Sequence, residues 1–356
     1  MTNRERFKKI MQFERPDALP VLAFEPFEID GLANWRKEGL KDGVSIQEQL
    51  GMAAFDEIPL HLDPLPAFEQ RILFEDDNEI IQTEGMGTTV RRLKSSPNLY
   101  YGFLDHPVKS ADDWERYKER LLASTPGRIP GDIEVYAKKL NASSNPVLLN
   151  IFPFFFRLGF YTMGMERFMT AFYDMPELIH DMFSFWSKYV LDVIDPLLKH
   201  IDIDCVSLNE DLAYKSGTHI SPEVYKEFWI PHQAPVISAL KGAGIDTICL
   251  WTAGNIKNLL PLFMNAGINC TWPLERIAGM DPIELQREYG NSLRLAGGFP
   301  KEALIEGPEA IDRALEALMP AIQAGGYIPA LDDMVPVEVP LENYVYFINA
   351  LRAVRF

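Results

Sequence analysis

CVSLNED at residues 205–211 is the first of five strand-like runs that end in polar, aromatic or acidic residues; the others are TICLWTAGN (247–255), NCTWPLE (269–275), RLAGG (294–298) and YIPALDD (327–333). In a parallel α/β barrel, the loops that follow the strands gather at one face, and that face carries the reactive groups. The runs therefore predict a site at one rim that contains Glu210, Trp251, Asn255, Glu275, Asp332 and Asp333.

The rest of the chain extends this pattern, and we predict eight strands that alternate with helices. They span residues 20–24, 58–62, 146–152, 203–208, 247–251, 267–272, 292–297 and 327–331. Capping signals mark helix starts at Thr2 with Glu5, at Ser221-Pro222 and at Asp281-Pro282. Alternation of this length favours an α/β fold of the (β/α)8 TIM-barrel type over an open doubly wound sheet. Residues 71–93 alternate in polarity and break twice, which predicts antiparallel strands that, with the N-terminal helix, decorate the barrel.

Composition limits the classes of protein that fit. The chain has 356 residues and is 47% hydrophobic, which suits one large domain over residues 1–356. A formal net charge of -17 argues against nucleic-acid and anionic-membrane partners. The N-terminus lacks a signal-peptide pattern, and no run approaches the roughly 20 apolar residues of a membrane span. Cys205, Cys249 and Cys270 lack metal-binding spacing and are predicted to be buried, reduced thiols. We therefore expect a cytoplasmic protein.

The order of several short motifs resembles the uroporphyrinogen decarboxylase superfamily, which includes that decarboxylase and the methyltransferases that work with corrinoid proteins. The resemblance covers nearly the whole chain and rests on these segments: NRER at 3–6, RPD at 15–17, WRKEG at 35–39, ISPE at 220–223, WIP at 229–231, PLE at 273–275, AGMD at 278–281, GG at 297–298, GGYIP at 325–329 and PLEN at 340–343. It implies the barrel fold but no single reaction.

Departures from the superfamily patterns exclude two of its chemistries. The decarboxylase is expected to hold propionates with an early arginine pair and to have a late histidine, whereas this chain has LAFEPF at 22–27 and LDDM at 331–334. Acidic groups would repel a highly carboxylated porphyrinogen, so true uroporphyrinogen decarboxylase activity is not expected. The thiol-methylating members are expected to bind zinc through His-x-Cys-Gly and a late cysteine. Trp251-Thr-Ala-Gly254 and Asp333 stand there instead, so that zinc site is not expected either.

Two sets of candidate site residues follow. Glu210, Glu275 and Asp333 are the catalytic candidates, because carboxyl groups at strand ends serve as general acids or bind a hard cation of unknown identity. The substrate-binding candidates are Glu25, Phe152, Tyr214, Trp251, Asn255 and Asp332, where aromatic surfaces suit a planar or apolar ligand. Structural alternatives stay open. Some carboxylates would only cap helices or pair with Lys215 and Arg276, residues 152–156 would pack the helical shell, and Asn255 would cap a helix.

The resemblance and the candidate residues lead to one functional hypothesis and two rivals. We expect a methyltransferase-like enzyme that moves a methyl group from a small methylated substrate, such as a methoxylated aromatic compound, to a corrinoid carried by a separate protein in anaerobic C1 metabolism. The rivals are a decarboxylase or lyase for a non-porphyrin small molecule and a non-catalytic corrinoid- or tetrapyrrole-binding barrel. Assembly into a homo-oligomer also fits the sequence.

Overall fold

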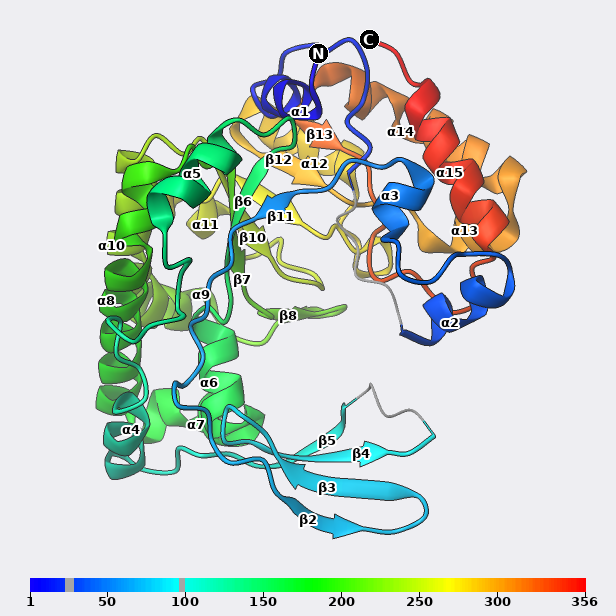
Figure 1. Cartoon of the computed structure of the whole chain (residues 1–356). Helices are drawn as coiled ribbons and strands as arrows, with labels where there is room; N and C mark the ends of the chain where they lie inside the picture. Colours follow the sequence, from blue (N-terminus) through cyan, green and yellow to red (C-terminus); the bar gives the residue numbers. More distant parts are fainter. Residues whose placement is uncertain (23–28, 96–99) are drawn as a thin grey trace.

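A curled parallel sheet forms the centre of the molecule (Figure 1). The computed structural model describes residues 1–22, 29–95 and 100–356. Within them the sheet has seven strands in the order β1-β6-β7-β10-β11-β12-β13, and all neighbouring pairs are parallel. The strands are β1 (Asp56–Glu57), β6 (Val147–Ile151), β7 (Cys205–Asn209), β10 (Thr247–Trp251), β11 (Cys270–Trp272), β12 (Arg294–Ala296) and β13 (Tyr327–Ile328).

Helices cover the outer face of this sheet. The longest, α8, runs for 25 residues and packs on α10. The α-helices are α1 (Asn3–Met11), α2 (Ile29–Lys37), α3 (Ile46–Leu50), α4 (Ala111–Lys118), α5 (Ile133–Asn141), α6 (Phe155–Met163), α7 (Met165–Asp174), α8 (Pro176–His200), α9 (Pro222–Val224), α10 (Ile230–Gly242), α11 (Leu260–Ala266), α12 (Pro282–Tyr289), α13 (Lys301–Glu306), α14 (Pro308–Ala324) and α15 (Leu341–Ala353). A π-helical turn, η1 (Tyr225–Trp229), joins α9 to α10, and two 3-10 turns are η2 (Arg276–Ala278) and η3 (Gly290–Ser292).

Side-chain alternation separates the two faces of the sheet. On β6, Val147, Leu149 and Ile151 are fully buried on the helix side, while Leu148 and Asn150 are partly exposed on the inner side. Residues in register on parallel neighbours share a face. The pairing of Trp251 with Asn209 and with Trp272 therefore places these three side chains on one common face.

Most predicted strands are confirmed, with two differences. The strand expected at 58–62 instead lies at Asp56–Glu57. The N–H of Ile58 still donates to the carbonyl of Leu148, but Pro59 has no N–H to continue the ladder. Of the strand expected at 20–24, the described part forms a single parallel bridge between Leu22 and Ala53. That bridge extends the sheet beyond β1, and closure as a full eight-stranded barrel stays a prediction.

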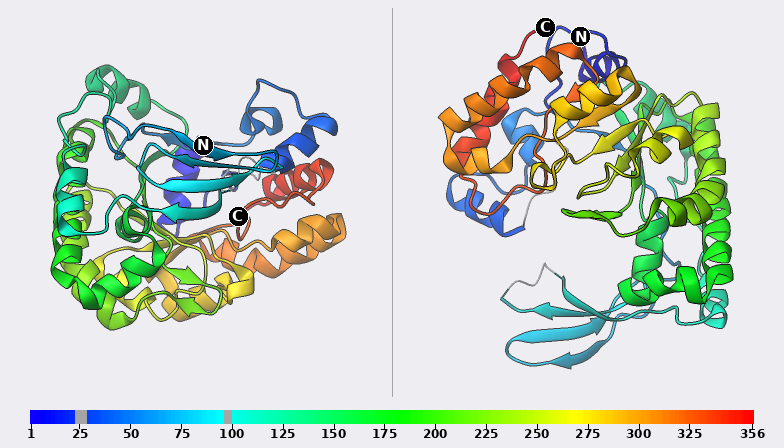
Figure 2. Two further views of the ribbon diagram at one scale, coloured as in Figure 1. Left: turned by 90° about the horizontal axis from the view of Figure 1, so that it is seen from below. Right: turned by 180° about the vertical axis from the view of Figure 1, so that it is seen from behind.

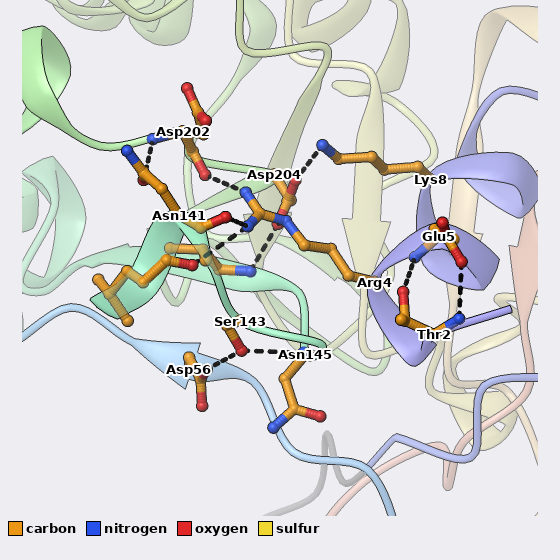
Figure 3. Close-up of polar contacts among 12 residues, drawn as sticks. Thr2, Arg4, Glu5, Lys8, Asp56, Asn141, Ser143, Asn145, Asp202 and Asp204 are labelled. Atoms are coloured by element: carbon orange, nitrogen blue, oxygen red, sulfur yellow. Dashed lines mark hydrogen bonds and ion pairs between the residues drawn. The ribbon is translucent and has the colours of Figure 1, made fainter. Parts of the chain in front are cut away.

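The amino-terminal face of the sheet is closed by a cluster of charges around Asp204 (Figure 3). The Asp204 carboxylate lies 2.7 Å from Nε of Arg4 and 2.8 Å from Nζ of Lys8, and it also accepts from the N–H of Val147. The predicted capping box of Thr2 and Glu5 is confirmed at the start of α1. Because Asp204 is buried and each oxygen meets a cation, this cluster fastens α1 to the sheet.

A second, antiparallel sheet extends beyond the carboxyl ends of the parallel strands (Figures 1 and 2). It consists of β2 (Ile72–Glu75), β3 (Glu79–Thr83), β4 (Thr89–Leu93) and β5 (Tyr100–Asp105), which confirms the predicted decoration. A short hairpin, β8 (Ala213–Tyr214) with β9 (Gly217–Thr218), lies on the same side. Within the described segments, no helix has both the length and the apolar character needed to cross a membrane.

Candidate active site at the carboxyl ends of the parallel strands

Arg157 forms the centre of an aromatic and charged group at the rim. It lies in the first turn of α6, directly after β6, and its guanidinium carbon is 4.8 Å from the centre of the Trp251 ring and 5.5 Å from that of Phe152. Its Nη2 is 3.6 Å from the Asp211 carboxylate. A cation held against aromatic faces is favoured electrostatically, most strongly where water is partly excluded. The structure thus brings together two predicted residues, Phe152 and Trp251.

Two carboxylates of the rim, Asp211 after β7 and Asp333 after β13, each pair with a cation. Although 47% of the Asp211 side chain is exposed, partial burial raises its pKa; Arg157 and His219 act against that shift, and the negative charge of Asp333 adds to it. Asp333 in turn lies 3.0 Å from Nζ of Lys301. The described rim therefore holds two cation–carboxylate pairs, and the two carboxylates are close enough to influence each other.

The inner face below these charges offers hydrogen-bond acceptors. Oδ1 of Asn209 and Oδ1 of Asn150 are buried and have no hydrogen-bond partner among the described residues. Asn209 shares its face with Trp251, and Nδ2 of Asn150 donates to Glu57 at 3.1 Å. The ring of Trp272 meets that of Trp251 edge-on, with 6.1 Å between centres. This face combines two indole rings set edge to face with two amide oxygens that lack a protein partner among the described residues.

Glu210, the first catalytic candidate, lies beneath the rim and not on it. Its side chain is 1% exposed; Oε2 accepts from the N–H of Phe156 and Oε1 accepts from Nε1 of Trp229. Burial raises the pKa of Glu210 to about 8, against these two hydrogen bonds. The carboxyl group thus ties the end of β7 to the start of α6 and to the π-helical turn η1, and it directly underlies Arg157.

Asp332 and Glu275 also engage backbone donors. Asp332 is 1% exposed and accepts from the N–H groups of Lys301 and Arg276, and burial raises its pKa to about 6. Glu275 accepts from the N–H of Gly254 at 2.8 Å. Asp332 thus caps the start of α13, a helix that precedes it in the chain and not the next helix of the capping alternative. Together the contacts of Asp332 and Glu275 join the loops after β10, β11, β12 and β13.

The remaining predicted residues fall outside this group. Tyr214 is 60% exposed on the β8–β9 hairpin, and its carbonyl accepts from the N–H of Asn255. Asn255 is not a helix cap, which corrects that alternative: its side chain accepts from Lys257 in a local turn, and α11 begins only at Leu260. Glu25 lies outside the described residues. Phe154, Phe155 and Phe156 are all buried, which confirms for these three residues the alternative that they pack within the helical shell.

Comparison with known proteins identifies the family. The model of the family "Uroporphyrinogen decarboxylase (URO-D)" matches residues 81–354. This chain belongs to that family. No curated protein matches it in sequence.

The fold of this uroporphyrinogen decarboxylase family member is also found among solved structures. A methyltransferase from Methanosarcina mazei is 15% identical, with 99% of this chain and 98% of that chain covered and a TM-score of 0.63. A "Putative Vitamin-B12 Independent Methionine Synthase" from Listeria monocytogenes is 13% identical over 96% of both chains, at a TM-score of 0.42. The first likeness shows a shared fold, and the second is too low to support an argument.

Three rim residues, Arg157, Asp211 and Lys301, are not among the predicted site residues. Asp211 follows the end of β7, so the strand-end rule that predicted Asp333 applies to it as well. Arg157 and Lys301 are cations in the first turn of the helix that follows a strand, Arg157 after β6 and Lys301 after β12, and the same rule extended by one helical turn includes them. The described residues contain no group of three or more His, Cys, Asp or Glu side chains placed to hold a metal ion.

Proposed function

We propose that this member of the uroporphyrinogen decarboxylase family transfers a methyl group from a small methylated aromatic compound to a corrinoid carried by a separate protein. The observation that carries the proposal is the contact of Arg157 with Phe152 and Trp251 at the carboxyl ends of the strands. Active sites of parallel barrels lie at that face. The family membership and the fold shared with a methyltransferase support the reaction class.

The inner face suits a planar substrate. Its ring would stack on one of the two indoles, Trp251 or Trp272, and meet the other edge-on. A hydroxyl group of the substrate would donate to Oδ1 of Asn209 or Asn150. Arg157 would orient an electron-rich or anionic substituent from the rim. Orientation of this kind makes a large contribution to catalysis, because it removes the entropic cost of aligning the reactants.

Methyl transfer from an ether oxygen leaves an electron pair on that oxygen, which must be protonated or otherwise stabilised. Asp211 is the rim acid that pairs with Arg157, and burial raises its pKa in the direction that a proton donor needs. Burial is the main cause of that rise in pKa, and the charge of Asp333, held by Lys301, adds to it. Glu210, Glu275 and Asp332 would position the loops, since their carboxylates already accept from protein N–H groups.

The chain itself has no zinc-thiolate site, whereas the corrinoid would be carried by a partner protein. At the place of the superfamily's zinc-binding segment stands Trp251-Thr-Ala-Gly254, so the residues present do not fit a zinc-thiolate site, and no step of the proposal involves a metal. A reduced corrinoid on the partner protein would act as the nucleophile that accepts the methyl group.

Decarboxylation of uroporphyrinogen does not fit this rim, because a carboxylate lies beside Arg157 and another beside Lys301.

The test is to incubate the purified chain with a reduced corrinoid protein and a panel of methoxylated aromatic compounds, and to follow products by mass spectrometry. Loss of about 14 mass units from the substrate, the mass of one CH₂, supports methyl transfer. Loss of carbon dioxide, or tight corrinoid binding without turnover, would overturn it in favour of a lyase or a binding protein. Trp251→Ala should abolish turnover, whereas Tyr173→Ala, an exposed aromatic residue on α7, should leave it unchanged.

A further inference from the structure

The antiparallel sheet has an apolar edge strand. β2 pairs with β3 on one side only, and on its other side no described strand pairs with it. Its three apolar residues are consecutive and all exposed: Ile72 by 60%, Leu73 by 57% and Phe74 by 46%. An exposed apolar edge is a template for pairing with another strand, and charged residues within an edge strand are one of the features that prevent such pairing. The only charged residue of β2 is its last, Glu75, and Arg71 directly precedes the strand.

If a second copy of β2 lies antiparallel beside the first, the positive end of each strand meets the negative end of the other. Arg71 precedes the apolar residues, and Glu75, Asp76 and Asp77 follow them. We infer that β2 pairs in antiparallel fashion with β2 of a second copy of this chain, which joins the two sheets into one continuous sheet. With the twofold axis at Leu73, Arg71 of each copy lies opposite Glu75 of the other. Leu73 then faces Leu73 of the second copy, and Ile72 faces Phe74.

The strand is held in place for such pairing by its contacts with β3. The N–H of Thr83 donates to the carbonyl of Arg71 at one end, and the N–H of Asp76 donates to the carbonyl of Glu79 at the other. A β-bulge between Ile72 and Phe74 lies between these two contacts. Bulges re-aim side chains, which agrees with the exposure of all three consecutive residues.

The charges at the ends of β2 remain available to a second copy. Arg71 pairs with Glu69 and Glu75 pairs with Lys94 within the chain, but the side chains of Arg71 and Glu75 are still 65% and 46% exposed. Two copies that each carry a net charge of -17 repel each other over most of their surface. Antiparallel pairing of β2 sets Arg71 of one copy against acidic residues of the other, which favours this orientation over others. One pair of strands is a small interface, and a dimer that dissociates on dilution is expected.

The test is sedimentation velocity of the full chain over a range of concentrations. The expected result is a monomer–dimer equilibrium, and Arg71→Glu should raise its Kd by about tenfold or more, because two like-charge cross-strand pairs replace two attractive ones. Phe74→Asp should have a similar effect. Mixing Arg71→Glu with Glu75→Lys should restore dimers, since the carboxylate introduced in one variant then faces the ammonium group introduced in the other. Leu104→Asp, at an exposed residue of the opposite edge strand β5, is the matched control.

Two outcomes would overturn the inference. A chain that stays monomeric at every concentration has no self-pairing edge, and this surface would then be open to another partner. Dimers that persist unchanged in both Arg71→Glu and Phe74→Asp would place the interface elsewhere. Both substitutions are at exposed positions and should leave thermal unfolding unchanged. If it is unchanged, a loss of dimers in these variants does not come from misfolding.

Discussion

The guanidinium of Arg157 lies 4.8 Å from the centre of the Trp251 ring, although the two residues follow different strands of the sheet. Arg157 follows β6 and Trp251 ends β10, and β7 lies between these two strands. The contact therefore spans the end of β7, where Asp211 pairs with the same guanidinium at 3.6 Å. One side chain thus joins the loops of three neighbouring strands at the proposed site.

Replacing Arg157 should change the pH dependence of the reaction. Arg157 lowers the pKa of Asp211 against the effect of burial, so Arg157→Met removes that opposition and raises the pKa further. If Asp211 is the proton donor, the alkaline limb of the rate profile should move to higher pH, and KM should rise by about tenfold as a cation–π and charge contact is lost. Arg116→Met, at an exposed residue of α4, is the control. A lower rate with an unmoved profile would show that Asp211 is not the proton donor.

Glu210 should make stability fall as pH rises. Its pKa is raised from 4.5 to about 8 in the folded protein, so between these values the folded state keeps a proton that the unfolded state releases. The free energy of unfolding should therefore decrease with pH across this window, by up to about 1.4 kcal/mol per pH unit, and level off above it.

Denaturant unfolding of the wild type and of Glu210→Gln at pH 5.5 to 8.5 measures this contribution. The difference between the two proteins isolates Glu210 from other groups that titrate in the same range. Glu210→Gln should also cost roughly 1 to 3 kcal/mol, because an amide nitrogen cannot accept from Phe156 or Trp229. Parallel stability curves for the two proteins would contradict a raised pKa.

Gly254 should not tolerate a side chain. Its φ is +82°, and a Cβ there would meet the Ala213 carbonyl carbon at 2.6 Å. Gly244 has the same φ of +82°, but its Cβ would meet nothing within 4 Å. Gly244→Ala should thus cost only the backbone strain, about 1 kcal/mol, and Gly254→Ala should cost clearly more because the β8–β9 hairpin must move. Equal melting temperatures for the two variants would show that the hairpin yields freely.

Asp332 should matter more for stability than its neighbour Asp333. Asp332→Ala leaves the N–H groups of Lys301 and Arg276 without their acceptor in a buried place, which should cost roughly 2 to 4 kcal/mol. Asp333→Ala removes a partly exposed pair with Lys301 and should cost less than about 1 kcal/mol. Thermal unfolding of both variants, with turnover measured in parallel, separates the two roles: Asp333→Ala should lose activity while it keeps its stability.

The sequence determined the parallel strands and the face that carries the site. The runs at 205–211 and 247–255 predicted the carboxyl ends of β7 and β10 within a residue of those observed, because apolar runs and the polar residues after them reflect local burial. The capping signals at Thr2, Ser221 and Asp281 were likewise local and are confirmed. The strand at 58–62 was misplaced because its apolar pattern outweighed Pro59 in the prediction.

Only the tertiary structure decided which side chains share the site. Asn209 and Glu210 are adjacent in sequence, yet Asn209 is on the inner face beside Trp251 while Glu210 points into the helix layer. Successive side chains of a strand point to opposite faces of the sheet. If a strand end is predicted one residue too late, a side chain that packs among the helices is therefore taken for one that faces the ligand. The approach of Arg157 to Trp251 depends on the spacing of strands that are distant in sequence, and local pattern carries no information about that distance.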